Sequence, residues 1–304
     1  MKRRDFLKDA ALVVAGLGLS PSLTPAFAES LEQLASGKAP VLWLQGLACS
    51  GCSVSLLNSD DPDPVDLVTR YLSLYYHPVL SGASGSQALE TLETVIARGD
   101  YLLVVEGAVP LGMPQACKVG HEPFSELFAR VARSAKIVIA AGTCAAFGGV
   151  ASAPPNLTGA APLAKAMEQA GVSTPLLRLP GCPVHPARLV GNLIHLLRLG
   201  MPKCDELQRP LRQYGELLHT QCLYFADYQE KRFARNFGDP GCQFKLGCQG
   251  VITKSDCSRR KWNDGVNWCI EARGVCVGCC HEGFLANPDF PLYRFYEEHQ
   301  EHEA

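Results

Sequence analysis

Four cysteines lie within twelve residues in the stretch GVNWCIEARGVCVGCC, which covers residues 265–280. They are Cys269, Cys276, Cys279 and Cys280. The chain holds 14 cysteines among 304 residues, more than packing alone requires in a protein of this length. Thiolates at such short spacing bind zinc or iron–sulfur clusters, so the stretch predicts metal–thiolate chemistry.

Further cysteines follow short apolar runs in the first two-thirds of the chain. Three runs lead into cysteine-bearing loops, VLWLQG, KIVIAAG and PLLRLPG, and a fourth, YLLVVEG, contains Glu106. Continuous apolarity predicts strands buried on both faces, as in a parallel sheet. The carboxyl ends of such strands meet at one edge, where ligands bind. We therefore expect four thiols to converge there: Cys49, Cys52, Cys144 and Cys182.

Helix-compatible stretches alternate with these runs, at 87–99, 124–135, 161–171 and 185–200. Strand and helix in alternation predict an α/β fold with a doubly wound parallel sheet. From about residue 201 the pattern fades, and nine cysteines lie between Cys204 and Cys280. We expect a smaller, irregular domain over 201–304, whose folding energy comes partly from metal ligation.

The second half supplies eight more candidate ligands. They are His219, Cys222, Cys242, Cys248, Cys257, Cys269, Cys276 and Cys279. With the four strand-end thiols they make eleven cysteines and one histidine, enough for three four-ligand sites. The thiols left over are Cys117, Cys204 and Cys280, and we expect six histidines to be structural or exposed: His77, His121, His195, His281, His299 and His302. Spacing alone leaves zinc sites and a partial disulfide scaffold open.

The N-terminus has the layout of an export signal. A basic start is followed by an apolar run and by Ala26-x-Ala28, which predicts a signal peptide at 1–28 and a linker at 29–40. Arg3 and Arg4 resemble a twin-arginine signal, which carries folded proteins to the periplasm, so metal sites would be filled before export. No later segment reaches 18 apolar residues, and we expect no membrane anchor. The formal charge of -2 gives no reason to expect nucleic acid.

Taken together, these motifs resemble the small, electron-transferring subunit of a nickel–iron hydrogenase. The matching motifs occur in the family's order: LACSGC, VEGAVP, GTCAAFGG, LPGCPVHP, HTQC, PGCQFKLGC, KWNDGVNWC and CVGC. The resemblance implies a flavodoxin-like domain over 41–200 that binds a proximal [4Fe–4S] cluster through Cys49, Cys52, Cys144 and Cys182. It implies a distal [4Fe–4S] cluster on His219, Cys222, Cys242 and Cys248. It also implies a medial cluster that uses Cys257, Cys276 and Cys279.

Cys269 decides the type of the medial cluster. Many members of the family have proline at this position and carry a [3Fe–4S] cluster, whereas a fourth thiolate allows [4Fe–4S], as in the nickel–iron–selenium branch. We expect three [4Fe–4S] clusters, with [3Fe–4S] at the medial site if Cys269 is not a ligand. Cys280 is then a packed thiol. Gly51 and Gly149 occupy the positions of the extra cysteines of oxygen-tolerant relatives, so the resemblance implies an ordinary four-cysteine proximal cluster.

The resemblance also implies partners. The nickel–iron centre, which splits H2 reversibly, lies in a separate large subunit that in one branch contains selenium, and the expected outer partner is a periplasmic cytochrome c. Glu106 resembles a family carboxylate near the proximal cluster, a candidate for proton handling or interface hydrogen bonding. Two alternatives remain at this point: a cluster subunit of a quinone-reducing complex, which lacks the HTQC to CVGC region, and a stand-alone multi-cluster electron carrier.

Overall fold

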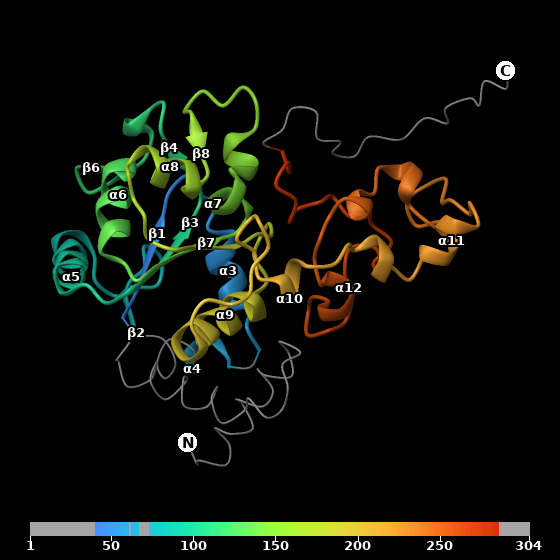
Figure 1. Ribbon diagram of the computed structural model, residues 1–304, viewed down its shortest axis with the longest axis horizontal. Coiled ribbons are helices and arrows are strands. Elements are labelled where there is room, and N and C mark those ends of the chain that lie inside the picture. The colour runs from blue at the N-terminus through green and yellow to red at the C-terminus, as the bar shows by residue number, and fades with distance from the viewer. Residues whose placement is uncertain (1–39, 61, 67–72, 286–304) are drawn as a thin grey trace, which may run out of the picture.

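A five-stranded parallel sheet forms the centre of the molecule (Figure 1). The computed structural model describes residues 40–60, 62–66 and 73–285, so the predicted signal peptide, most of the linker, His299 and His302 lie outside the described residues. The strands are β1 (Pro40–Gln45), β2 (Ser73–Tyr76), β3 (Leu102–Glu106), β7 (Ile137–Ala141) and β9 (Leu176–Leu179), in the order β2-β1-β3-β7-β9. This is the strand order of flavodoxin-like folds, and it confirms the predicted fold class.

Two details differ from the prediction. The edge strand β2 was not predicted, because SLYY is short and half-buried and has no continuous apolar run. The predicted linker at 29–40 is one residue too long, since Pro40 already belongs to β1 and is buried. A proline is acceptable there because the first position of a strand does not need its N–H in the ladder.

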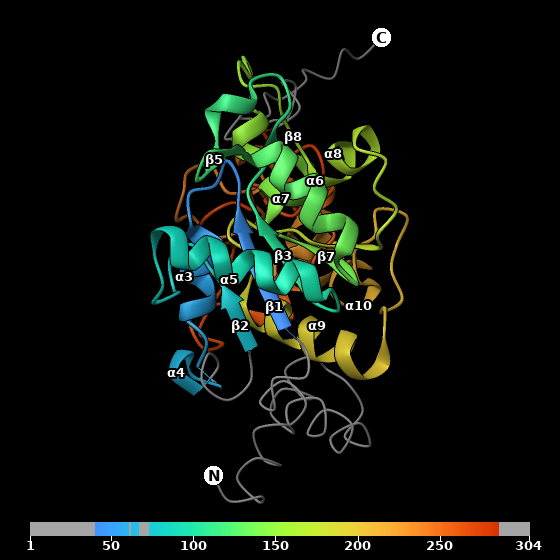
Figure 2. The ribbon, with the colours of Figure 1, turned by 90° about the vertical axis from the view of Figure 1, so that its left-hand side faces the viewer.

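Helices cover both faces of the sheet (Figure 2). On one face, α5 (Gly85–Arg98), α6 (Phe124–Ser134) and α8 (Leu163–Gln169) pack on a core that includes Leu42 and Leu44. On the other face, α3 (Gly51–Leu57) and α9 (Pro186–Leu199) pack on a core that includes Val41 and Trp43. Alternate residues of β1 therefore enter opposite cores, which is why the strand reads as continuously apolar.

Short elements follow the carboxyl ends of β3 and β7. They are β4 (Val109–Pro110), η3 (Pro114–Ala116), β5 (Lys118–Val119), β6 (Glu122–Pro123), α7 (Thr143–Phe147), η4 (Gly149–Ser152) and β8 (Ala160–Ala161), whereas α4 (Pro64–Asp66) lies between α3 and β2. β4 pairs with β8, and β5 pairs with β6, both antiparallel. These pairs hold the loops that follow β3 and β7.

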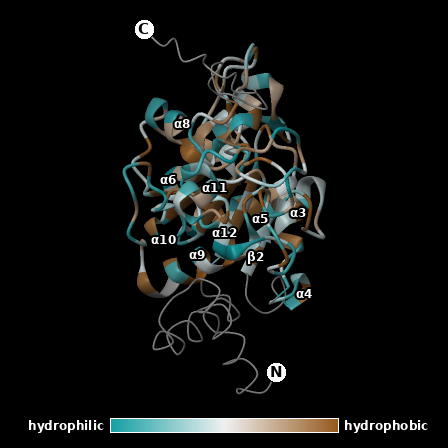
Figure 3. Cartoon of the chain, turned by 90° about the vertical axis from the view of Figure 1, so that its right-hand side faces the viewer, coloured by the Kyte–Doolittle hydropathy of each residue, from teal (hydrophilic) through white to brown (hydrophobic). Residues whose placement is uncertain are grey.

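Beyond residue 200 the chain contains only short helices in the part that the structure describes. They are α10 (Leu211–Tyr214), η5 (His219–Gln221), α11 (Phe225–Gln229), η6 (Phe244–Leu246), η7 (Gln249–Val251) and α12 (Cys257–Arg260). Their small core contains Leu218, Trp268 and Ile270 together with two cysteines, Cys248 and Cys276. Figure 3 shows hydrophobic and hydrophilic segments interleaved around α11 and α12. The predicted irregular region is thus present.

The C-terminal region is attached to the α/β layer through α9 and α7. The ring of His185, which caps α9, lies 4.6 Å from that of Trp262 and its Nε2 is 2.9 Å from the carbonyl oxygen of Lys261. The Thr143 hydroxyl at the start of α7 donates a hydrogen bond to the carbonyl oxygen of Cys279. None of the helices within residues 40–60, 62–66 and 73–285 is long and apolar enough to cross a membrane.

Candidate metal centres

The four strand-end cysteines converge at the carboxyl edge of the sheet. Cys49 and Cys52 follow β1, Cys144 lies in α7 after β7, and Cys182 follows β9. Burial raises the pKa of the Cys52 thiol, which is raised further by Glu106, Cys144 and Cys182. Burial, together with Cys144 and Cys49, raises the pKa of Cys182 to about 11. Crowded thiols such as Cys52 and Cys182, whose ionisation is disfavoured, fit a site where bound iron supplies the missing positive charge.

Glycine at position 142 makes room for one of these sulfurs. Gly142 has a φ of +86°, and a Cβ added there would lie 2.4 Å from the Cys52 Sγ. A side chain at 142 would therefore displace Cys52 as well as strain the backbone. Backbone N–H groups also face the sulfurs, since Gly51 donates to the Cys49 Sγ at 3.4 Å and Val184 to the Cys52 Sγ at 3.5 Å.

Glu106, at the end of β3, holds the turn that carries Cys52. Its side chain is buried, with 2% of the residue exposed. One carboxylate oxygen accepts from the Cys52 N–H at 2.8 Å, and the other accepts from the N–H and the hydroxyl of Ser53 at 3.2 and 2.6 Å. The Gln45 amide donates to the same second oxygen at 3.0 Å. Both oxygens are thus engaged by donors from β1 and α3.

His77 extends this network behind Glu106. Its Nδ1 accepts from the backbone N–H groups of Val79 and Leu80 at 3.0 and 3.2 Å, so the proton resides on Nε2. That nitrogen is 3.2 Å from the Ser53 hydroxyl, which itself donates to Glu106. Burial lowers the pKa of His77 to about 4 and keeps it neutral. His77 is a buried structural histidine as expected, but its link to Glu106 was not predicted.

The four predicted distal ligands line one small cavity. His219, Cys222, Cys242 and Cys248 surround it together with Phe244 and Ile270. Burial, together with the neighbouring Cys248 and Cys222, raises the pKa of Cys242 to about 11. Among the described residues the buried Nε2 of His219 has no hydrogen-bond partner, and burial lowers the pKa of this imidazole. A neutral ring with an unused nitrogen beside three thiols fits a metal ligand.

The predicted medial ligands form the third group. Cys257 begins α12, and Cys269, Cys276 and Cys279 lie in the turns that follow. The pKa of Cys276 is raised by burial and then by the charges of Cys248, Cys257 and Cys269, which places these thiols next to one another. Cys269 is exposed as a residue, although its thiol lies deep enough for burial to raise its pKa.

Cys280 connects the medial group to the strand-end group. It is 1% exposed, as expected for a packed thiol. A hydrogen bond with Cys257 lowers the pKa of the Cys280 thiol, whereas Cys279 and burial raise it. The net effect is a raised pKa of about 12 for Cys280. Its charge also raises the pKa of Cys182 in the strand-end group. Cys280 therefore lies between two sets of predicted ligands.

The remaining thiols take part in ordinary packing. Cys117 packs against the core under α5 and α6, and Cys204 packs against the opposite core and donates to the Pro202 carbonyl at 3.2 Å. All 14 cysteines are free thiols, so the disulfide scaffold left open by spacing is absent. Within the described ranges no three His, Cys, Asp or Glu side chains are placed to hold a single metal ion.

Sequence reasoning missed one residue beside these groups. Arg188, in the first turn of α9, is fully buried against Asp256 and donates to the Cys257 Sγ at 3.2 Å. The sequence gives little indication that Arg188 is buried, because an arginine in a predicted amphipathic helix normally faces solvent. Only its position six residues after Cys182 pointed toward the site.

Two family models match the chain. Residues 49–196 match the 20 kDa subunit of NADH ubiquinone oxidoreductase, and residues 214–291 match the C-terminal part of NiFe and NiFeSe hydrogenase small subunits. The second match covers the HTQC to CVGC region, which subunits of quinone-reducing complexes lack in the alternative considered above. It therefore argues against that alternative.

Individual relatives match over nearly the whole chain. The periplasmic [NiFeSe] hydrogenase small subunit of Desulfomicrobium baculatum is 36% identical over 96% of both chains. The uptake hydrogenase small subunit of Azotobacter vinelandii is 37% identical over 95% of this chain and 81% of its own. The H2-activated D. baculatum [NiFeSe] hydrogenase structure superimposes with a TM-score of 0.81 over 85% of this chain and 99% of that one, at 36% identity. The structure of the Desulfovibrio vulgaris Hildenborough [NiFeSe] hydrogenase superimposes with a TM-score of 0.80 at 35% identity. The match covers 84% of this chain and 98% of that one.

Proposed function

Because the chain belongs to the family of nickel–iron and nickel–iron–selenium hydrogenase small subunits, we propose that it relays electrons through three iron–sulfur clusters during H2 ⇌ 2 H+ + 2 e−. This proposal is supported by the arrangement of the candidate ligands in three neighbouring groups. The Cys257 and Cys280 sulfurs both lie within 4 Å of the Ser255 hydroxyl, and Cys280 donates to the carbonyl of Pro180, two residues before Cys182. The Cys248 Sγ and the Cys276 Cβ both lie within 4 Å of a Cβ added at Gly250. The groups thus form a continuous series from the sheet edge to the cavity around His219.

The proposed ligand sets follow these groups. The proximal set is Cys49, Cys52, Cys144 and Cys182, the medial set is Cys257, Cys269, Cys276 and Cys279, and the distal set is His219, Cys222, Cys242 and Cys248. When bound, each cluster accepts and releases one electron at a time. With Cys269 as a ligand the medial cluster is [4Fe–4S], and without it [3Fe–4S].

The protein's own groups set how easily each site takes up negative charge. Backbone N–H groups face the sulfurs at Gly51, Val184 and Tyr224, the last donating to the Cys222 Sγ at 3.4 Å. Hydrogen bonds to sulfur favour the reduced, more negative state. A neutral imidazole at His219 adds no negative charge, which suits an outer site that hands electrons to a carrier. The hydrogen bonds of Glu106 favour a structural role, in which it fixes the turn that carries Cys52, rather than a role in proton transfer.

The partners and location belong to the proposal too. We propose that the larger partner holds the nickel–iron centre, with or without selenium, and that a periplasmic cytochrome c is the external carrier. The D. baculatum relative is periplasmic by name, and the twin-arginine pair Arg3-Arg4 supports export of the folded protein to the same compartment. Fractionation after a high-salt wash should recover the protein outside the membrane fraction.

The decisive experiment is purification of the native complex followed by metal analysis. We expect a second, larger protein that contains nickel, and about twelve irons per small subunit, four for each cluster. Changing Cys248→Ser should lower the iron content and the electron transfer to an added carrier, whereas the matched control Cys117→Ser should leave both unchanged. A nickel-free preparation, or iron for one cluster only, would contradict the proposal.

A further inference from the structure

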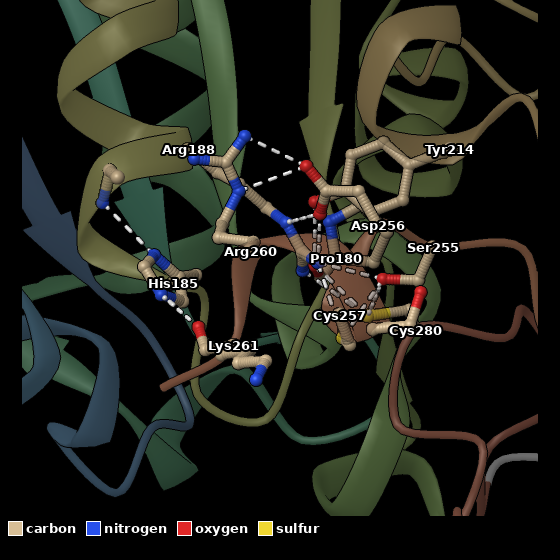
Figure 4. Close-up of polar contacts among 12 residues, drawn as sticks. Pro180, His185, Arg188, Tyr214, Ser255, Asp256, Cys257, Arg260, Lys261 and Cys280 are labelled. Carbon is tan, nitrogen blue, oxygen red and sulfur yellow. Dashed lines mark hydrogen bonds and ion pairs between the residues drawn. The ribbon is translucent and has the colours of Figure 1, made fainter. Parts of the chain in front are cut away.

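A buried charge cluster lies between the strand-end and medial groups. Arg188, 1% exposed, donates from Nε to an oxygen of Asp256 at 2.9 Å. Arg260 donates to the other oxygen of the same carboxylate, at 2.9 Å from Nε and 2.7 Å from Nη2. Two guanidinium groups thus share one carboxylate, and the cluster carries a net positive charge (Figure 4).

The three charged groups of this cluster are joined by charge-assisted hydrogen bonds. Both oxygens of the Asp256 carboxylate are engaged by guanidinium groups, one by Arg188 and the other by Arg260. A buried ion pair stabilises a fold little more than apolar side chains of the same volume would. The position of Arg188 is therefore better explained by what else the guanidinium contacts.

Arg188 contacts sulfur as well as carboxylate, since its Nη2 donates to Asp256 at 2.5 Å and also faces a thiol. Its Nη2 is 3.2 Å from the Cys257 Sγ and 2.7 Å from the Ser255 hydroxyl, and its Nη1 is 3.6 Å from the Cys280 Sγ. The ring of Tyr214 lies under the guanidinium at 5.2 Å, and its hydroxyl donates to the Pro180 carbonyl at 2.8 Å. Cys280 donates to the same carbonyl at 3.6 Å. The Tyr214 ring and the Ser255 hydroxyl therefore fix the Arg188 guanidinium next to the sulfurs of Cys257 and Cys280.

We propose that Arg188 is a positioning residue that fixes the Cys257 sulfur and raises the reduction potential of the medial cluster. The proposal rests on the proposed function, in which Cys257 is a medial ligand. Two effects act in the same direction. The N–H donor stabilises charge on the sulfur, and the positive charge of the guanidinium beside it favours the reduced site. Asp256 opposes the second effect, so the two residues of one ion pair have opposite influences on the potential.

This opposition separates an electrostatic role from a merely structural one. Arg188→Gln removes the positive charge and should lower one of the three cluster potentials. Asp256→Asn leaves both guanidinium groups without their carboxylate and should raise that same potential. A clamp that only joins α9 to residues 255–257 would give no such pair of opposite shifts.

The test uses the purified heterodimer, with cluster potentials from a redox titration followed by electron paramagnetic resonance. The matched control is Arg209→Gln, since Arg209 is also buried and ion-paired, and hydrogen bonds to the carbonyl rather than the sulfur of Cys280. We expect three potentials close to those of the wild type in the control. If Arg188→Gln fails to fold, Asp256→Asn decides alone, and a higher potential supports the proposal.

Two outcomes overturn the inference. Either full iron content with unchanged potentials in both variants, or shifts of both variants in the same direction, would show that Arg188 does not tune the medial site. Failure of the proposed function looks different, because the wild-type preparation would then contain no nickel, or iron for one cluster only.

Discussion

At the scale of the residue, Cys269 decides between two kinds of medial site. Changing Cys269→Pro removes one thiolate and should convert the medial cluster from [4Fe–4S] to [3Fe–4S] with the fold retained. The oxidised variant should then show a [3Fe–4S] signal, and the medial potential should rise because one negative ligand is gone. A stoichiometric [3Fe–4S] signal from the unmodified protein would remove Cys269 from the ligand set.

Glu106 is the second residue with a specific expectation. Glu106→Gln replaces one acceptor oxygen by an NH2 group, which faces either the Cys52 N–H or the donors of Gln45 and Ser53. The unsatisfied donors should cost about 1–3 kcal/mol locally. Amide hydrogen exchange in α3 should accelerate accordingly, while Glu122→Gln at the surface should leave α3 unchanged. Unchanged α3 exchange with lost activity would instead support a proton-handling role.

His77 should make stability depend on pH. The folded protein holds it neutral with a pKa of about 4, below the ordinary value of 6.5, so the unfolded chain binds the proton first as the pH falls. The contribution of His77 to the free energy of unfolding should therefore decrease between pH 6.5 and about 4, by up to about 3 kcal/mol, and this contribution should change no further below. His77→Asn should flatten this dependence, measured by hydrogen exchange of β1 and β3 after correction for intrinsic rates.

At the scale of the element, continuous apolar runs were sufficient to predict β1, β3, β7 and β9 and the convergence of the thiols that follow them. The edge strand β2 was not predicted because Ser73–Tyr76 is short and mostly half-buried, with no continuous apolar run. The role of Arg188 was not predicted for a different reason. Its partners Ser255, Asp256 and Cys257 lie 67 to 69 residues away in the sequence, and no local pattern encodes such a contact. The paths of the turns beyond residue 200 depend on those contacts too.

The turn between β7 and α7 carries its own prediction. Gly142→Ala places a methyl group against the Cys52 sulfur in a backbone conformation that alanine rarely adopts, so the proximal site should lose iron. Gly171→Ala is the matched control, since it has a similar positive φ of +62° with open space around the added carbon. The control should cost some stability and no iron, and iron analysis of both variants distinguishes the two effects.

At the scale of the whole molecule, the two parts depend on metal to different extents. The sheet packs between two apolar cores, whereas the core beyond residue 200 is small and includes predicted ligands. Removing iron with a chelator under reducing conditions should therefore unfold residues 215–285 first. Hydrogen exchange should remain slow in β3 and β7 and become fast around α12. Uniform loss of protection in both parts would contradict this expectation.

The contacts of Thr143 with Cys279, and of Arg188 with residues 255–257, have a consequence for biosynthesis. The sheet and its first thiols leave the ribosome early, but their neighbours in the C-terminal region are translated more than sixty residues after Arg188. The medial ligands cannot come together until translation has passed Cys279. Under the proposed ligand sets, iron delivery to the medial site would be a late event of maturation, and the nascent chain would have to keep its early thiols reduced until then.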